Sequence, residues 1–256
     1  MKNKEFIKFM SRAVCHHFNM ILKNSERTKE SISASRFYDS SAKINRVISP
    51  HPYDTEMYVE TITTVDAILK YDNPVALNFA SFLIPGGHYL TGSFSQEESL
   101  CHHSNLYEIL SSFDNWYFLN KNMYMNNNLY TNRAIVTPGV LFDGRKEAEI
   151  ISIAAPNING ANLMDAHEFK KASDIFKDRI DFVLEIASYC DPEVLILGAF
   201  GCGDFGNDPY VCAKRFKELL DTKYKNVFKK VVFAIPKAGS KNHNAFCEYF
   251  KLKLKR

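Results

Sequence analysis

The sequence lacks the features that mark several classes of protein. No apolar run reaches the roughly 20 residues that a membrane-spanning helix needs. The first twenty residues have neither the uninterrupted apolar core nor the small-residue cleavage site of a secretory signal. The net charge of +3 is mild, without the concentrated basic face of a nucleic-acid-binding protein. We therefore expect no membrane association and no dedicated nucleic-acid site.

Cysteine pairs and metal-binding motifs are also missing. The six cysteines are scattered and form no C-x-x-C pair, which favours reduced thiols and a cytoplasmic protein. The triplets Cys15-His16-His17 and Cys101-His102-His103 look alike, but neighbouring residues of a helix point in different directions. The sequence contains neither a G-x-S-x-G elbow nor an H-E-x-x-H motif. We predict no metal and no cofactor.

What the sequence does have is a large apolar fraction, 46%, with 20 Phe and 13 Tyr, enough for a substantial core. Apolar runs and helical periodicity alternate along the chain. The expected strands are residues 57–62, 75–80, 133–138, 150–156, 194–200 and 230–236. The expected helices are residues 4–23, 63–71, a helix starting at Ser95, 166–189, a helix starting at Asp208-Pro209, and 243–252 with its basic end. This alternation predicts one three-layer α/β domain with a mixed or parallel sheet.

Two polar stretches interrupt this pattern. Residues 24–56 are expected to form a loop-rich connector, and residues 114–132 are expected to be irregular. We accordingly divide the chain into an N-terminal extension, residues 1–56, with an amphipathic helix packed on the body, and a main domain, residues 57–256. We expect a monomer.

The stretch from Asn78 to Leu110 is the first candidate for chemistry. It leaves an apolar strand at Asn78, crosses Pro85-Gly86-Gly87 and reaches Gln96-Glu97-Glu98 at a helix start. Ser95 and Glu98 also fit a capping box, in which the serine caps the helix and the glutamate reaches back. Two carboxylates behind a glycine loop, at the end of a buried strand, equally fit a ligand site. The sequence leaves both interpretations open.

The second candidate is the glycine-rich loop after the strand at 194–200. Gly201, Gly203 and Gly206 match G-x-G-x-x-G before a helix, where backbone N–H groups can hold a diphosphate. An NAD-binding fold is one alternative, but the motif lies late in the chain and the next strand supplies no acidic residue for a ribose. An ordinary tight turn is the other alternative. A third strand end, residues 154–157, either lines the same crevice or forms a turn.

Together these motifs resemble the microbial-type poly(ADP-ribose) glycohydrolases, which have a macrodomain fold. The segments that carry the resemblance are NFAS, PGG, SQEESLCHHSNLYEIL, LGAFGCGDFGNDP and VVFAIP. The resemblance runs from about residue 63 to about residue 250, and residues 1–62 match the family's helical N-terminal extension only loosely. It implies a three-layer α/β/α macrodomain with a mixed central sheet, and an enzyme that releases ADP-ribose from poly(ADP-ribose) on modified proteins.

The resemblance also implies roles for individual residues. Glu98 would be the catalytic acid/base, Glu97 would hold ribose hydroxyls, and Gln96 would support the pair. Asn78 would bond a ribose hydroxyl. Gly86 and Gly87 would let the backbone approach the ligand. The residues expected to wrap the diphosphate are Gly201, Cys202, Gly203, Asp204 and Phe205, with Phe205 near the terminal ribose, and Gly206 is a further substrate-binding residue. The resemblance does not identify the adenine pocket, and for it we take Ile235, Pro236 and Phe246 from the end of the last strand onward.

One position departs from the family pattern. The family has three consecutive glycines before Gln-Glu-Glu, and here the third is His88. A side chain there would either crowd the loop or add a cationic contact to the substrate. Two alternatives to the polymer-cleaving enzyme follow: a macrodomain that binds ADP-ribose without cleaving it, and a hydrolase of mono-ADP-ribosylated targets.

Overall fold

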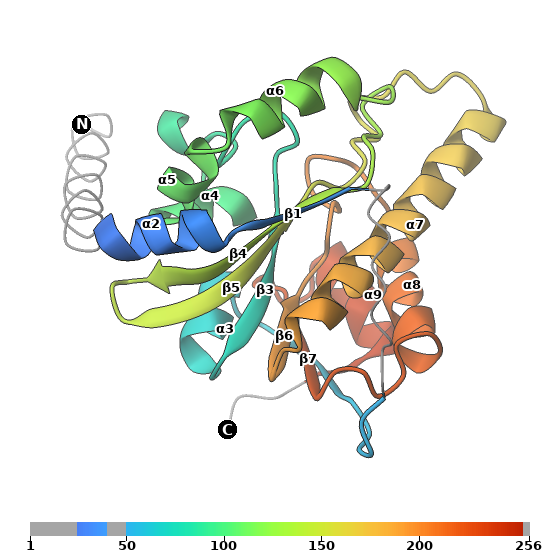
Figure 1. Ribbon diagram of the computed structural model, residues 1–256. Helices are drawn as coiled ribbons and strands as arrows, with labels where there is room; N and C mark the ends of the chain where they lie inside the picture. Colours follow the sequence, from blue (N-terminus) through green and yellow to red (C-terminus); the bar gives the residue numbers. More distant parts are fainter. Residues whose placement is uncertain (1–24, 40–49, 253–256) are drawn as a thin grey trace, which may run out of the picture.

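The computed structural model describes residues 25–39 and 50–252, and the helix expected at 4–23 lies outside them. Within the described residues one mixed sheet has the strand order β1-β4-β5-β3-β6-β7-β2-β8 (Figure 1). The strands are β1 (Arg36–Asp39), β2 (Glu56–Glu60), β3 (Pro74–Phe79), β4 (Arg133–Phe142), β5 (Lys146–Ile153), β6 (Val194–Leu197), β7 (Lys230–Ala234) and β8 (Lys251–Leu252). The α/β class expected from the sequence is confirmed.

The centre of the sheet consists of parallel neighbours. β3 pairs in parallel with β5 on one side and with β6 on the other, and β6 pairs in parallel with β7. The carboxyl ends of these four strands therefore meet at one edge of the sheet. Every residue of β6 is buried and β3 is buried up to Phe79, as expected of strands covered on both faces. The loops that leave this edge carry the candidate residues.

Helices cover both faces of the sheet. On one face, α3 (Thr64–Lys70), α4 (Gln96–His102) and α5 (Leu106–Ser111) pack with Ala76 and Ile150. On the other face, α7 (Ala166–Cys190), α8 (Pro209–Asp221) and α9 (Lys241–Tyr249) pack with Val75 and Leu77. Successive residues of β3 thus enter opposite cores, as the strand pleat requires. The result is the predicted three-layer arrangement.

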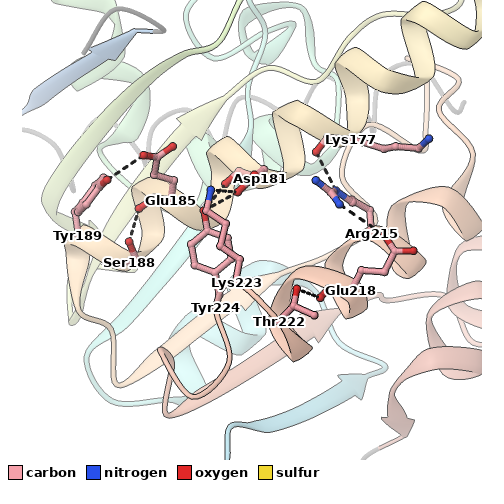
Figure 2. Close-up of polar contacts among 10 residues, drawn as sticks. All are labelled: Lys177, Asp181, Glu185, Ser188, Tyr189, Arg215, Glu218, Thr222, Lys223 and Tyr224. Atoms are coloured by element: carbon pink, nitrogen blue, oxygen red, sulfur yellow. Dashed lines mark hydrogen bonds and ion pairs between the residues drawn. The ribbon is translucent and has the colours of Figure 1, made fainter. Parts of the chain in front are cut away.

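Polar contacts tie α7 to α8 and to the turn after it (Figure 2). The Tyr224 hydroxyl donates to Asp181 Oδ1 at 2.6 Å, and Lys223 Nζ lies 2.7 Å from the same oxygen. Arg215 Nε donates to the Lys177 carbonyl at 3.4 Å. The α8 helix begins as predicted, with the Asp208 side chain accepting from the Tyr210 N–H and Pro209 in its first turn. Since α8 follows the glycine-rich loop, these contacts anchor one side of that loop.

Four predictions of secondary structure are wrong, and the fourth concerns the helix expected from Ser95. Residues 25–39 are not a loop: they form α2 (Ser25–Ala34) and β1, which pairs with β4. Residues 114–132 include a helix, α6 (Asp114–Met123). The closing helix ends at Tyr249, and Lys251–Leu252 form β8 beside β2. The boundary at residue 56 stays a prediction, although β1 belongs to the same sheet as the rest.

The helix expected from Ser95 onward is two helices. Between α4 and α5, Ser104 pairs with Phe142 in an isolated antiparallel bridge, and the Asp143 N–H donates to the His103 carbonyl at 2.8 Å. The Asn105 side chain accepts from the Leu141 N–H at 2.9 Å. These contacts with the β4–β5 hairpin interrupt the helix. None of the helices among residues 25–39 and 50–252 combines the length and apolar character needed to cross a membrane.

Candidate functional site

A cavity of about 470 Å³ lies over the carboxyl ends of β3, β6 and β7, and Ala155 after β5 also lines it. This position is the usual ligand site of an open α/β sheet. Both candidate stretches of the sequence reach it. The predicted residues that line it are Gly87, His88, Gln96, Glu97, Glu98, Gly201, Gly203, Asp204 and Phe205.

Four predicted residues do not line the cavity: Asn78, Gly86, Cys202 and Gly206. Asn78 is fully buried behind Glu97, so its expected bond to a ribose hydroxyl stays a prediction. Gly86 packs against Tyr107 and Cys101. Gly206 packs against the Asn159 side chain, and the Cys202 thiol donates to the Phe200 carbonyl at 3.3 Å. These residues shape the loops from behind.

Glu97 is a buried carboxyl with a partner on each oxygen. Asn78 Nδ2 donates to Glu97 Oε1 at 3.2 Å, and the Ser81 N–H donates to Oε2 at 2.7 Å. The residue is 3% exposed. Burial raises the pKa of Glu97 to about 8, while the hydrogen bonds from Ser81 and Asn78 oppose this rise and the neighbouring Glu98 adds to it. Glu97 therefore carries a proton over much of the neutral pH range.

Glu98 has a different environment from its neighbour. Its Oε1 accepts from the His88 N–H at 2.8 Å, and no residue that the structure describes donates to its Oε2. The capping box is not formed: the Ser95 side chain caps no N–H, and Glu98 reaches His88 instead of the Ser95 backbone. The S-x-x-E pattern thus serves the site, and Oε2 of Glu98 is available to a ligand.

Gln96 is a brace between α4 and the end of β3. Its Oε1 accepts from the Phe79 N–H at 2.8 Å. Its Nε2 donates to the Leu77 carbonyl at 2.9 Å and to Thr64 Oγ1 at 3.1 Å. Because its amide is fully occupied within the protein, Gln96 holds the first turn of α4, and with it both carboxylates, against the strand.

The glycine turn before α4 depends on positive φ angles, +67° at Gly86 and +58° at Gly87. A Cβ on Gly87 would lie 2.6 Å from Glu98 Oε1 and 3.0 Å from Glu97 Oε2. Glycine is therefore needed at 87 both for its backbone conformation and for the space that the carboxylates occupy. His88 has φ −96°, which any residue adopts, and its side chain does not strain the turn.

The glycine-rich loop after β6 is braced from below. Asn207 Nδ2 donates to the Pro156 carbonyl at 2.8 Å and to the Gly201 carbonyl at 3.0 Å. The Ile158 N–H donates to the Phe205 carbonyl at 2.8 Å, and Asn159 Nδ2 donates to the Asp204 carbonyl at 3.0 Å. The strand end at 154–157 and the loop after it thus support the glycine-rich loop.

The upper side of this loop offers donors. Within the part of the chain that the structure describes, the N–H groups of Gly203, Asp204 and Phe205 have no protein acceptor. A Cβ on Gly203 would meet no atom within 4 Å, so the loop is open there. Adjacent backbone N–H groups beside a cavity form an anion-binding concavity suited to phosphate. Phe205 is held by an edge-to-face contact with Tyr130, their ring centroids 6.2 Å apart.

Sequence reasoning missed one residue that holds Glu97 and one that braces the glycine-rich loop. Ser81 and Asn207 act through local hydrogen bonds that no periodicity reveals, although both lie within segments that matched the family. Of the three guesses for the adenine pocket, Ile235 and Pro236 line the cavity. The third, Phe246, does not line the cavity. Its side chain is fully buried in the core, where the centroid of its ring lies 5.1 Å from that of Phe233.

The side chains of His102 and His103 diverge, as expected for neighbours on a helix. His102 stacks on Phe94, whereas His103 Nδ1 lies 3.1 Å from Asp143 Oδ1. Among residues 25–39 and 50–252, no group of three or more His, Cys, Asp or Glu side chains could hold a metal ion.

Comparisons with known proteins agree on one family. Residues 16–142 match the family model of the microbial-type PARG catalytic domain. The fold is similar to poly(ADP-ribose) glycohydrolase from Thermomonospora curvata, with a TM-score of 0.78 and 28% identity over 88% of this chain and 89% of that one. It is also similar to the enzyme from Deinococcus radiodurans in complex with ADP-ribose, with a TM-score of 0.78 and 28% identity over 87% and 96%. A structure of the Thermomonospora enzyme with the inhibitor ADP-HPD matches at a TM-score of 0.77 and 28% identity, over 88% of each chain. A search of curated proteins gives no match.

Proposed function

Because the chain belongs to the microbial-type poly(ADP-ribose) glycohydrolase family, we propose that it hydrolyses the ribose–ribose O-glycosidic bonds of poly(ADP-ribose) and releases ADP-ribose. The observation that carries this proposal is one cavity with a carboxylate pair on one wall and the loop of free N–H groups on another. The first suits glycosidic cleavage and the second suits a diphosphate. ADP-ribose contains both a ribose and a diphosphate.

Glu98 is the acid/base in this proposal. Cleavage passes through a ribose with oxocarbenium character, and the departing oxygen needs a proton while the incoming water must lose one. Glu98 Oε2 has no protein donor among the described residues, so the protonated form of Glu98 can give its proton to the leaving oxygen, and the carboxylate that results can take a proton from the attacking water. The His88 N–H on Oε1 fixes the orientation of the carboxyl during both transfers.

Glu97 supplies a second carboxyl without a second full charge. Since burial raises its pKa to about 8, Glu97 is largely protonated at neutral pH. A protonated Glu97 can donate to a ribose hydroxyl, and it spares the site the repulsion of two adjacent carboxylates once Glu98 has given up its proton. Asn78 and Ser81 hold it in place from the protein side.

The diphosphate would bind along residues 203–205. Its two phosphates would accept from the N–H groups of Gly203, Asp204 and Phe205, which the loop presents without rearrangement. Fixing the diphosphate places the attached ribose against the two glutamates at the other wall. Much of the rate enhancement would therefore come from positioning.

The test is release of ADP-ribose from radiolabelled polymer by the wild type and by Glu98→Gln. Glutamine keeps an oxygen that can accept from His88 but has no transferable proton, so we expect release to fall by at least about 100-fold. Because no capping box is formed, the melting temperature of Glu98→Gln should stay close to that of the wild type.

Calorimetry with ADP-ribose completes the test. Glu98→Gln should bind ADP-ribose about as tightly as the wild type, because the diphosphate loop is unchanged. If the wild type binds ADP-ribose tightly but cleaves no polymer, the proposed hydrolase activity is rejected, and the protein only binds ADP-ribose. Equal release by wild type and variant would reject the role of Glu98.

A further inference from the structure

An exposed aromatic ring stands at the rim of the cavity beside the carboxylate pair. Phe94 lines the cavity and is 57% exposed. Ile84 and Leu90, which precede Phe94 in the chain, are also exposed, by 49% and 75%. Ile84 lines the cavity as well. Two apolar side chains, Ile84 and Phe94, are therefore exposed at the mouth of the site on the side of the glycine turn.

Hydrogen bonds place Phe94 close to Glu98. The His88 N–H donates to Glu98 Oε1 at 2.8 Å, and the Ser93 N–H donates to the His88 carbonyl at 3.3 Å. The backbone of His88 thus connects Ser93 to Glu98, the proposed acid/base, and Phe94 directly follows Ser93. The 3₁₀ turn η1 (Tyr89–Thr91) lies within the loop that these bonds close.

The ring is also held in position. Phe94 stacks on His102 with ring centroids 4.7 Å apart and an interplanar angle of 23°. A ring nitrogen of His102 lies 3.1 Å from the Ser93 carbonyl. Tyr89 packs on His102 at 4.8 Å and on Tyr107 at 4.7 Å. Phe94 is therefore the outer member of a packed row of rings, and its exposed surface is available without a large entropic cost.

The chemistry of the polymer predicts what meets this ring. The bond that is cut ends on the 2′-oxygen of an adenosine, and the adenine of that adenosine is attached to the adjacent carbon, C1′. When the 2′-oxygen lies against Glu98, the adenine of the leaving unit must lie within a few ångströms of it. A single ADP-ribose attached to a protein has no adenine at this position. A flat apolar ring beside Glu98 therefore distinguishes the two substrates.

Resting on the proposed function, we propose that Phe94 stacks on the adenine of the leaving ADP-ribose unit and makes the enzyme prefer polymer over mono-ADP-ribosylated protein. Stacking of a base on an aromatic side chain is a sequence-tolerant and substantial contact. The subsite lies on the opposite side of the scissile bond from the diphosphate loop at Gly203–Phe205.

The experiment separates the two sides of the scissile bond. In a Glu98→Gln background, calorimetry measures the Kd of ADP-ribose and of the linear dimer of two ADP-ribose units. Phe94→Ala should weaken dimer binding at least about fivefold, the low end of what losing one base stack costs, and should leave the Kd of ADP-ribose unchanged. Phe94→Trp should restore dimer binding. Phe118→Ala is the matched control, because Phe118 is 65% exposed on α6 and does not line the cavity.

Turnover gives the second readout. With Glu98 intact, Phe94→Ala should lower kcat/KM for polymer and leave kcat/KM for a glutamate-linked mono-ADP-ribosyl peptide unchanged. Equal dimer affinity of Phe94→Ala and Phe118→Ala would overturn the inference while polymer cleavage by the wild type still supports the proposed function. Loss of ADP-ribose and dimer binding together would also overturn it, since Phe94 would then only support the loop. Failure of the wild type to cleave polymer would reject both.

Discussion

Gly87→Ala tests the geometry of the carboxylate pair directly. The added Cβ would stand 2.6 Å from Glu98 Oε1 and 3.0 Å from Glu97 Oε2. An ordinary contact needs about 3.4 Å, so Glu98 must retreat by roughly 0.8 Å. A displacement of this size at a reacting group costs about 100-fold in rate. The left-handed backbone at φ +58° adds about 1–2 kcal/mol of strain.

Gly239→Ala is the control, because Gly239 has a similar φ of +71° and a Cβ added there would meet no atom within 4 Å. Both variants should melt a few degrees lower than the wild type, at roughly 2–4 °C per kcal/mol. Only Gly87→Ala should lose polymer hydrolysis, measured as initial rates of ADP-ribose release. If the two variants hydrolyse polymer equally well, the glutamates do not occupy the positions described above.

Two further predictions concern buried ionisable side chains. The pKa of Glu97 rises from its ordinary value of 4.5 to about 8 on folding, so the folded state binds the Glu97 proton more tightly than the unfolded state does. The free energy of unfolding of the wild type, relative to that of Glu97→Gln, should therefore fall as the pH rises from 4.5 to 8. Urea unfolding at several pH values measures this difference. A flat difference across that window would contradict the assignment. Arg179 is 1% exposed, and it donates to the Ala154 carbonyl and, at 3.0 Å, to the Tyr130 carbonyl. In thermal unfolding, Arg179→Lys should lower the free energy of unfolding by about 1–3 kcal/mol, and it should raise KM for polymer. The control variant, Arg215→Lys, should change the free energy of unfolding by less than about 0.5 kcal/mol. Equal melting temperatures for these two arginine variants would show that the Arg179 contacts do not brace the site.

The central strands and the helices around them could be predicted because their signal is local. β3 and β6 are continuous apolar runs, and α7 repeats apolar residues with the period of a helix facing a core. Asp208-Pro209 marks the start of α8 by capping chemistry alone. In each of these cases the residues that determine the element lie within it.

The missed helices bury few side chains, and polar ones are prominent among them. The buried residues of α2 are Thr28 and Ser31, which contact Asn105 and the Gly139 carbonyl. In α6, Asn120 is buried and donates to the Phe82 carbonyl at 2.8 Å. Besides Asn120, α6 buries only Tyr117, so neither helix has the broad apolar stripe that a search for periodicity detects.

The capping box shows why the site itself was ambiguous. Ser95 and Glu98 have the spacing of a cap, and sequence alone does not say which N–H the glutamate will accept from. The choice is made by residues ten positions upstream, where the turn at Gly86 and Gly87 brings the His88 N–H to within 2.8 Å of Glu98. A long-range contact thus overrides a local pattern.

The same contact explains how the turn tolerates a histidine where the family pattern has a third glycine. Glu98 needs from position 88 only a backbone N–H, and the φ of −96° there is available to any residue. The positions that require glycine are 86, where a Cβ would meet Tyr107 at 2.8 Å, and 87, where it would meet both carboxylates. The His88 side chain lines the cavity without entering either contact, so it can differ between relatives without moving the glutamates. Proline is the exception, because it would remove the donor that orients Glu98.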